Sequence, residues 1–212
     1  MTKASGNPLP ERRLILVRHG VTVWNTEGRY TTRSDIPPSD EGIEQARAAA
    51  AALAATRIDR VFCSPLSRAR MTGEIIAAAQ RGSVPPVVVD ERLTEIDAGP
   101  FEGLTAAEIN AGPLAEAHTL WHSDTDPVTP AGAETLESAH RRAAAFFADV
   151  SGLDGTTLAA THGSLVRVLV ASVVLGAPPA AHRRLWLDNC HWVVIRLGLR
   201  PRMVAFNQGA RD

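Results

Sequence analysis

An Arg-His-Gly sequence follows directly on a run of apolar residues near the start of the chain. The apolar run LILV is followed by Arg18, His19 and Gly20, and a second His-Gly pair, His162 and Gly163, follows the stretch TLAAT. A neutral imidazole nitrogen is a nucleophile toward phosphorus, and a guanidinium matches the charge and shape of a phosphoryl group. If the fold brings the two pairs together, they could carry out phosphoryl transfer.

Two further charged residues follow stretches that are typical of strands. Arg68 lies in SPLSRA, and Glu95 lies in RLTEIDAGPFEG. A second guanidinium would help to hold the charge on the phosphoryl oxygens, and a carboxyl group could protonate the departing alkoxide and then activate water. We expect His19 to attack through one ring nitrogen while the other donates a hydrogen bond to a backbone carbonyl.

Strands and helices alternate along most of the chain, which predicts where these residues meet. Strands are expected at 12–18, 59–63, 87–89 and 157–161, and helices at 40–56, 66–81, 134–150 and 164–175. Two final strands, at 185–198 and 202–209, follow each other without a helix. This pattern predicts an α/β fold, a three-layer α/β/α sandwich with a mainly parallel central sheet and an antiparallel edge. The carboxyl ends of parallel strands share one edge of a sheet, so the charged residues should converge there.

Composition and length restrict the class of protein. With 212 residues, one domain over 1–212 is expected. The net charge of −1 gives no support for a nucleic-acid partner, and no apolar run is long enough to span a membrane. Cys63 and Cys190 form no CxxC pair, which favours a reduced, cytoplasmic setting. The expected partner is a small phosphate ester, and the sequence is compatible with a homodimer.

Four motifs occur in an order that resembles the histidine phosphatase superfamily, in its phosphoglycerate-mutase-like branch. They are RHGVTVWN at 18–25, SPLSRARMT at 64–72, LTE at 93–95 with GPFEG at 99–103, and HG at 162–163. The resemblance implies that His19 is the phosphorylated nucleophile and Glu95 the proton donor. It implies no metal and no cofactor. It also implies phosphoryl contacts from Arg18, Arg68 and His162, and substrate contacts from Asn25, Thr31 and Gly163.

The chain departs from this family pattern at a few positions. Val21 stands where relatives often carry Glu or Gln, and Thr31 with Thr32 stands where a small polar residue and Gly are common, so that Thr32 could narrow the entrance. After Asn189 and Cys190, similar phosphatases often carry Ser, whereas this chain carries His191. We expect these positions to affect the leaving-group side and to preserve the core mechanism.

The segment between the motifs favours hydrolysis over mutase chemistry. Only 67 residues separate Glu95 from His162, and the chain stops soon after its last strand, so a relatively open site is expected. We therefore predict a phosphomonoesterase. The alternatives are phosphoglycerate mutase-type transfer and a non-catalytic phosphoester-binding domain. A sugar phosphate, a phosphoglycerate derivative, α-ribazole phosphate and a nucleotide are all candidate substrates.

Other residues are expected to have structural or surface roles. The segment 92–132 should be a mostly irregular excursion over the active site, with a short helix near 105–110, and 1–11 should be flexible. Glu102 reads as a structural turn carboxylate, and the run from Trp121 to Asp126 reads as a solvated loop that could line the substrate pocket. His191 could face solvent or the leaving group. Surface positions are expected for His118, His140, His182, Arg141, Arg142, Arg183 and Arg184, and core positions for Val87–Val89 and Val193–Ile195.

Overall fold

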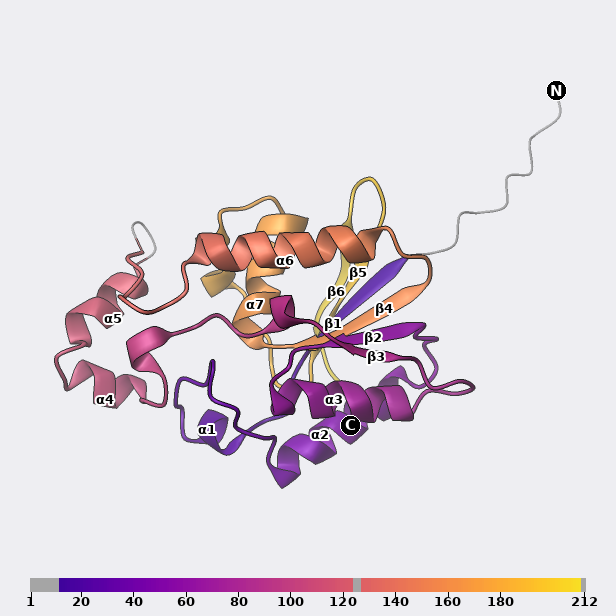
Figure 1. Cartoon of the computed structure of the whole chain (residues 1–212), viewed down its shortest axis with the longest axis horizontal. Coiled ribbons are helices and arrows are strands. Elements are labelled where there is room, and N and C mark those ends of the chain that lie inside the picture. The colour runs from indigo at the N-terminus through magenta and orange to yellow at the C-terminus, as the bar shows by residue number, and fades with distance from the viewer. Residues whose placement is uncertain (1–11, 124–126, 211–212) are drawn as a thin grey trace.

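A six-stranded sheet forms the middle layer of the protein (Figure 1). The computed structural model describes residues 12–123 and 127–210. The strands are β1 (Arg13–Arg18), β2 (Arg60–Cys63), β3 (Val87–Val89), β4 (Thr156–Thr161), β5 (Trp192–Arg196) and β6 (Arg202–Gln208). Their order is β3-β2-β4-β1-β5-β6, in which the first four are parallel and β5 and β6 are antiparallel to their neighbours. The predicted mainly parallel sheet with an antiparallel edge is confirmed.

Helices cover both faces of this sheet, with α2 and α3 on one side and α6 on the other (Figure 1). The helices are α1 (Val23–Thr26), α2 (Asp40–Leu53), α3 (Ser67–Ala78), α4 (Ala106–Asn110), α5 (Ala115–Trp121), α6 (Leu136–Ser151) and α7 (Gly163–Val168). Successive strand residues point to opposite faces. Leu14 and Leu16 therefore share a core cluster with Phe146 of α6, whereas Ile15 shares another with helix α2. One fully buried strand thus supplies both interfaces of the three-layer sandwich.

Polar caps determine where the long helices begin. The Ser39 hydroxyl accepts a hydrogen bond from the Gly42 backbone N–H at 3.2 Å, and α2 begins at the next residue. The Thr135 hydroxyl accepts from the Ser138 N–H at 3.1 Å at the start of α6. These bonds satisfy N–H groups that have no partner inside the helix.

The valines of β3 are exposed, so their predicted core position was wrong. Val87, Val88 and Val89 are 36%, 45% and 49% exposed. Strand β3 ends the sheet and pairs with β2 alone. An apolar run indicates a strand, but it does not show whether that strand is central or at an edge. In contrast, Val193 and Ile195 of β5 are buried as predicted.

The predicted helix over 164–175 and the predicted strand over 185–198 are each interrupted by local geometry. Strand β5 begins at Trp192 rather than near residue 185, because the segment before it turns and Cys190 adopts a left-handed backbone with φ of 53°. The helix predicted over 164–175 is α7 followed by a wider, π-helical turn over Leu169–Val174.

The excursion after β3 contains more helix than its composition indicates. The helix predicted near 105–110 is α4, but α5 was not predicted; the two lie together at one end of the molecule (Figure 1). Tyr30 and Trp121 pack there against the buried Phe101 and Ile109. The N-terminal segment 1–11 and residues 124–126 of the predicted solvated loop lie outside the described residues.

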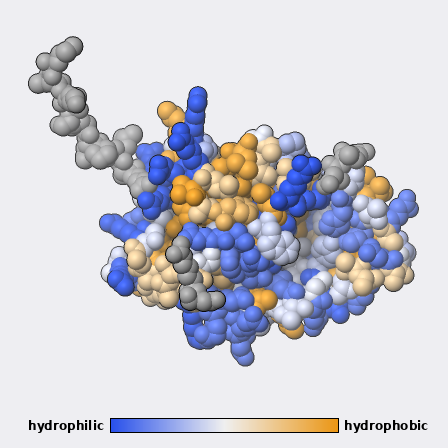
Figure 2. Space-filling view, turned by 180° about the vertical axis from the view of Figure 1, so that it is seen from behind, coloured by the Kyte–Doolittle hydropathy of each residue, from blue (hydrophilic) through white to orange (hydrophobic). Residues whose placement is uncertain are grey.

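The surface on the far side of Figure 1 is mixed in character. Hydrophobic residues gather in the upper middle of this face, and hydrophilic residues surround them (Figure 2). Within the described part of the chain, none of the helices combines the length and apolar character that a membrane-spanning helix requires.

Candidate active site

His19 stands at the carboxyl end of β1 with its ring orientation fixed. Its Nδ1 lies 2.8 Å from the carbonyl oxygen of Gly20, and because a carbonyl only accepts, Nδ1 carries the proton. This leaves Nε2 as the nitrogen with a free lone pair. Burial and the nearby charges of Arg18 and Arg68 hold the pKa of His19 well below its usual range. The ring is therefore neutral at neutral pH, as a nucleophile requires.

The residues after His19 bring the chain into close contact with α2. A Cβ at Gly20 would lie 2.2 Å from the carbonyl oxygen of Gly42, so a side chain cannot be accommodated there. Val21 contributes main-chain atoms: its N–H donates to Gln45 Oε1 at 2.9 Å, and its carbonyl accepts from the Ser39 N–H at 2.9 Å. These contacts require no polar side chain at position 21, which accounts for the valine.

Two guanidinium groups are buried beside His19. Arg18 donates from Nη1 to the Leu187 carbonyl at 2.6 Å, and Arg68, which is fully buried, donates to the carbonyls of Ser34 and Thr32 at 2.8 and 2.9 Å. Burial lowers the pKa of both arginines from its ordinary value, and no carboxylate of the described residues forms an ion pair with either of them. Both cations are held in place by backbone carbonyls rather than by acids.

His162 lies next to His19, from the end of β4. The two ring centroids are 5.2 Å apart in an edge-to-face arrangement, and His162 Nε2 lies 2.8 Å from the Ser64 hydroxyl. Burial, His19 and Arg68 hold the pKa of His162 well below its usual range. The fold thus joins the two His-Gly pairs that are distant in sequence.

Three nitrogen atoms of this cluster share an unusual property. Within the described residues, Arg18 Nε, Arg68 Nε and His162 Nδ1 are buried and have no hydrogen-bond partner. Buried polar atoms in proteins are normally hydrogen-bonded, because an unsatisfied one costs free energy. The oxygens of a phosphoryl group would supply acceptors for the two guanidinium N–H groups, and for His162 Nδ1 in the tautomer that carries the proton there.

Glu95 is held by the backbone N–H group of the next residue and by two more from the start of α7. Its Oε1 accepts from Ile96 and Leu165 at 2.8 and 3.0 Å, and its Oε2 accepts from Ser164 at 3.0 Å. Arg142 supports the segment from below by donating to the Thr94 carbonyl at 2.5 Å. The carboxylate is buried and cannot turn away without breaking these bonds.

A cavity of about 230 Å³ opens onto His19. Its lining is Arg18, His19, Asn25, Thr31, Glu95, Gly163, Ser164, Arg167, Trp186 and Leu187. Of the residues that the sequence indicated, Arg68 and His162 are fully buried rather than part of this lining, and the other six line it. Thr32 lies beside a neighbouring cavity and does not narrow this one.

Several residues that support the site were not identified from the sequence. Asn189 donates from Nδ2 to the carbonyl of His19 at 2.9 Å, and the Cys190 N–H donates to the Arg18 carbonyl at 3.0 Å. The Asn189-Cys190 sequence before β5 and β6 was the signal that could have identified these two residues. Ser164 follows the second His-Gly pair directly and Arg167 lies three residues after Ser164, and their position there was the signal for them.

Five of the seven predicted surface residues are buried or half-buried, and only Arg141 and Arg184 are exposed as predicted. His118 and His182 are 9% and 7% exposed, and they have hydrogen-bond partners in the Tyr30 hydroxyl and the Pro179 carbonyl. His140 and Arg183 are half-buried. Arg142 is half-buried in an ion pair with Glu134 at 2.8 Å. A helical pattern shows which face is polar, but not whether a partner from elsewhere covers it.

Two other predictions concerned residues near the site. Glu102 accepts from the backbone N–H groups of Thr32 and Ser34, so it is a structural loop carboxylate as predicted. The ring of His191 lies against Gly209 and does not line the cavity, so His191 does not approach the leaving group.

Comparisons with known proteins show which family and which structures the chain is similar to. The model of the histidine phosphatase superfamily (branch 1) matches residues 14–208. The chain is 35% identical to the "Probable phosphoglycerate mutase GpmB" of Proteus mirabilis, over 84% of this chain and 81% of the relative. Among solved structures, it superposes on the α-ribazole phosphatase of Shigella flexneri with a TM-score of 0.82 and 26% identity, covering 94% of this chain and 98% of the other. A mycobacterial glucosyl-3-phosphoglycerate phosphatase, in complex with VO3, gives 0.81 and 26%, covering 93% and 100%.

Proposed function

The chain belongs to the histidine phosphatase superfamily (branch 1), and from this premise we propose that it is a phosphomonoesterase acting on a small phosphorylated metabolite through a phosphohistidine on His19. One observation carries the proposal: a neutral histidine of fixed tautomer lies beside three buried nitrogen atoms that lack acceptors. We further propose that the chain is one domain, that it works without metal or cofactor, and that it acts in the cytoplasm.

In the first step, the lone pair of His19 Nε2 attacks phosphorus, and the P–O bond to the alcohol breaks. Arg18, Arg68 and His162 stabilise the charge on the transferring oxygens. The Glu95 carboxylic acid gives its proton to the departing alkoxide. The products of this step are a free alcohol, the Glu95 carboxylate and a phosphohistidine.

In the second step, the Glu95 carboxylate takes a proton from water while the water oxygen attacks phosphorus. The P–N bond breaks, phosphate is released, and His19 returns to its neutral form. Glu95 is again protonated, so no outside reductant, oxidant or second substrate is consumed. Water must reach the phosphohistidine for this step, and the cavity at His19 is open to the surface.

Mutase chemistry is the second candidate, because curated relatives at 34–35% identity carry phosphoglycerate mutase names. A mutase would return the phosphoryl group to a phosphoglycerate rather than to water. The two reactions share the phosphohistidine intermediate, and they differ in which molecule accepts its phosphoryl group.

The test is phosphate release from a panel of phosphate monoesters, measured beside the interconversion of 2- and 3-phosphoglycerate. We expect phosphate release that survives a chelator and is lost in His19→Ala, while His191→Ala, whose ring lies outside the cavity, keeps it. Full activity of His19→Ala would exclude His19 as the nucleophile. Rapid interconversion with little phosphate release would show a mutase instead.

A further inference from the structure

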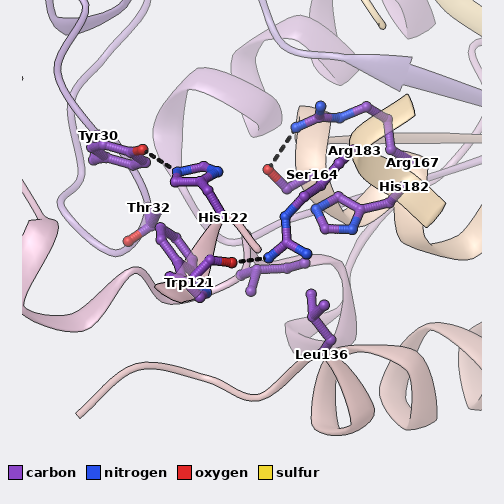
Figure 3. A pocket seen from close by; sticks show the side chains of 10 residues that line it. Tyr30, Thr32, Trp121, His122, Leu136, Ser164, Arg167, His182 and Arg183 are labelled. Atoms are coloured by element: carbon purple, nitrogen blue, oxygen red, sulfur yellow. Dashed lines mark hydrogen bonds between the residues drawn. The ribbon is translucent and has the colours of Figure 1, made fainter. Parts of the chain in front are cut away.

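The protein has a second cavity, of about 240 Å³, whose lining residues are drawn in Figure 3. Its lining is Tyr30, Thr32, Ile96, Trp121, His122, Leu136, Ser164, Arg167, His182 and Arg183. Ser164 and Arg167 line both cavities. The two cavities therefore meet along a common wall.

Consecutive residues face the two cavities along this boundary. Glu95 lines the cavity at His19, and Ile96 lines the second one. Likewise, Thr31 lines the cavity at His19, and Thr32 lines the second one. Glu95 would protonate the ester oxygen of the leaving alcohol, so that oxygen must lie at the boundary. The rest of the alcohol then extends into the second cavity.

Packed aromatic rings form one side of the second cavity. The rings of Tyr30 and Trp121 are 5.8 Å apart, and they lie 5.9 and 5.1 Å from the buried Phe101. The Tyr30 hydroxyl lies 2.8 Å from Nε2 of both His118 and His122. Ring packing and these two bonds restrict the motion of the wall, so that it is organised before a ligand arrives.

The remaining lining combines two guanidinium groups, of Arg167 and Arg183, with uncharged side chains. None of the described lining residues is an acid, and burial lowers the pKa of His182 to about 4, so this ring is neutral at pH 7. The guanidinium of Arg167 donates to the Ser164 hydroxyl at 3.1 Å, and that of Arg183 donates to the Trp121 carbonyl (Figure 3). Planar guanidinium groups and aromatic rings both offer flat faces for stacking.

We propose that the second cavity binds the alcohol part of the ester and selects alcohols that carry a flat, unsaturated ring close to the phosphorylated carbon. This inference rests on the proposed phosphatase function, because it takes Glu95 as the proton donor. Trp121 is then a specificity-determining residue, since its aromatic ring is part of the lining of this cavity.

The experiment compares three alkyl phosphates whose leaving alcohols have similar acidity. Benzyl phosphate carries a flat ring, cyclohexylmethyl phosphate a puckered ring of similar size, and ethyl phosphate no ring. With the wild-type chain, we expect kcat/KM for benzyl phosphate to exceed that for the other two by about tenfold, in keeping with the free energy of aromatic pairing. Trp121→Ala should lower kcat/KM for benzyl phosphate by about tenfold and leave ethyl phosphate within twofold.

Two further variants sharpen the result. Trp121→Phe should retain most of the preference, because it keeps a flat ring, and Leu120→Ala, at an exposed position next to Trp121, should change nothing. Equal values of kcat/KM for the benzyl and cyclohexylmethyl esters would overturn the inference. So would a tenfold preference for 3-phosphoglycerate over benzyl phosphate.

The wild-type comparison decides the matter even if Trp121→Ala fails to fold. Hydrolysis of all esters at similar rates would refute the ring preference and leave the phosphatase function intact. No phosphate release from any ester would instead refute the proposed function, and the inference with it.

Discussion

The carboxylate of Glu95 accepts a hydrogen bond at 3.0 Å from the backbone N–H of Ser164, a residue 69 positions further along the chain. Ser164 follows the His-Gly pair at the end of β4, so this bond ties the proposed acid to the same segment that carries His162. The distance between proton donor and phosphoryl group is therefore set by the sheet. We expect the site to respond sharply to changes at either end of this bond.

Replacing Glu95 by Gln removes the transferable proton with little change in shape. We expect kcat/KM for alkyl phosphates, which reports the reaction up to release of the alcohol, to fall by about 10²–10⁴-fold, the range typical of general acid catalysis. For p-nitrophenyl phosphate the fall should be much smaller, because nitrophenolate leaves without protonation. Steady-state kinetics on both esters measure the difference.

Glu91→Gln is the matched control, because Glu91 is exposed and lies only four residues away. Its kinetics should equal those of the wild type. Equal losses on both esters in Glu95→Gln would argue for a structural role of Glu95 and against proton transfer.

The His19 imidazole should remain neutral in mildly acidic solution. Its pKa is held well below 6.5 by burial and by Arg18 and Arg68, so lowering the pH from 7 to 6 does not protonate it. NMR of the imidazole nitrogens should show a proton on Nδ1 and none on Nε2 at pH 6, with His19→Asn identifying the signals. Titration of this ring near pH 6.5 would contradict the prediction.

His182 should make the fold sensitive to acid. Its pKa is about 4 in the folded protein, against 6.5 when unfolded, so below pH 6.5 the unfolded chain binds more protons. Above pH 6.5 the His182 ring is neutral in both states and does not reduce the free energy of unfolding. As the pH falls from 6.5 toward 4, proton binding to the unfolded chain lowers that free energy. By this linkage, the free energy of unfolding should drop by about 3 kcal/mol more in the wild type than in His182→Gln between pH 7 and pH 4.

Urea unfolding of both proteins at the two pH values measures this difference. The comparison isolates His182, because the other buried histidines are the same in both proteins. An equal loss of stability in the two would show that His182 does not contribute.

Arg142 should matter for both stability and activity. Arg142→Met breaks the ion pair with Glu134, whose side chain is only 10% exposed, and removes the bond to the Thr94 carbonyl beside Glu95. We expect a loss of about 2 kcal/mol in the free energy of unfolding, because the nearly buried carboxylate loses its closer guanidinium and keeps only Arg33, at 3.5 Å. A lower kcat for alkyl phosphates should accompany it.

Arg141→Met is the control, since Arg141 is the exposed neighbour on the same helix. It should leave both the urea midpoint and kcat unchanged. Similar effects of the two substitutions would mean that the loss reflects α6 as a whole rather than the contacts of Arg142.

Much of the architecture follows from local sequence patterns. The RLILVR strand has no polar alternation, and Ser39 precedes a helical repeat, so both elements could be predicted from neighbouring residues alone. The exposed β3 could not, because its position at the edge depends on which strands pair elsewhere. Helix α5 was missed for a related reason: its short sequence is stabilised by Phe101 and Tyr30 from distant segments.

The sequence by itself determined which side chains stand at the carboxyl ends of the strands, and therefore that histidines, arginines and a glutamate meet at one edge. That conclusion needs only the order of strands and helices, since parallel strands end on the same side. The tertiary structure alone decided the tautomer of His19, the burial of His182 and Arg142, and the aromatic cavity beside Glu95. Each of these depends on partners far away in the chain, and only packing determines which partner arrives.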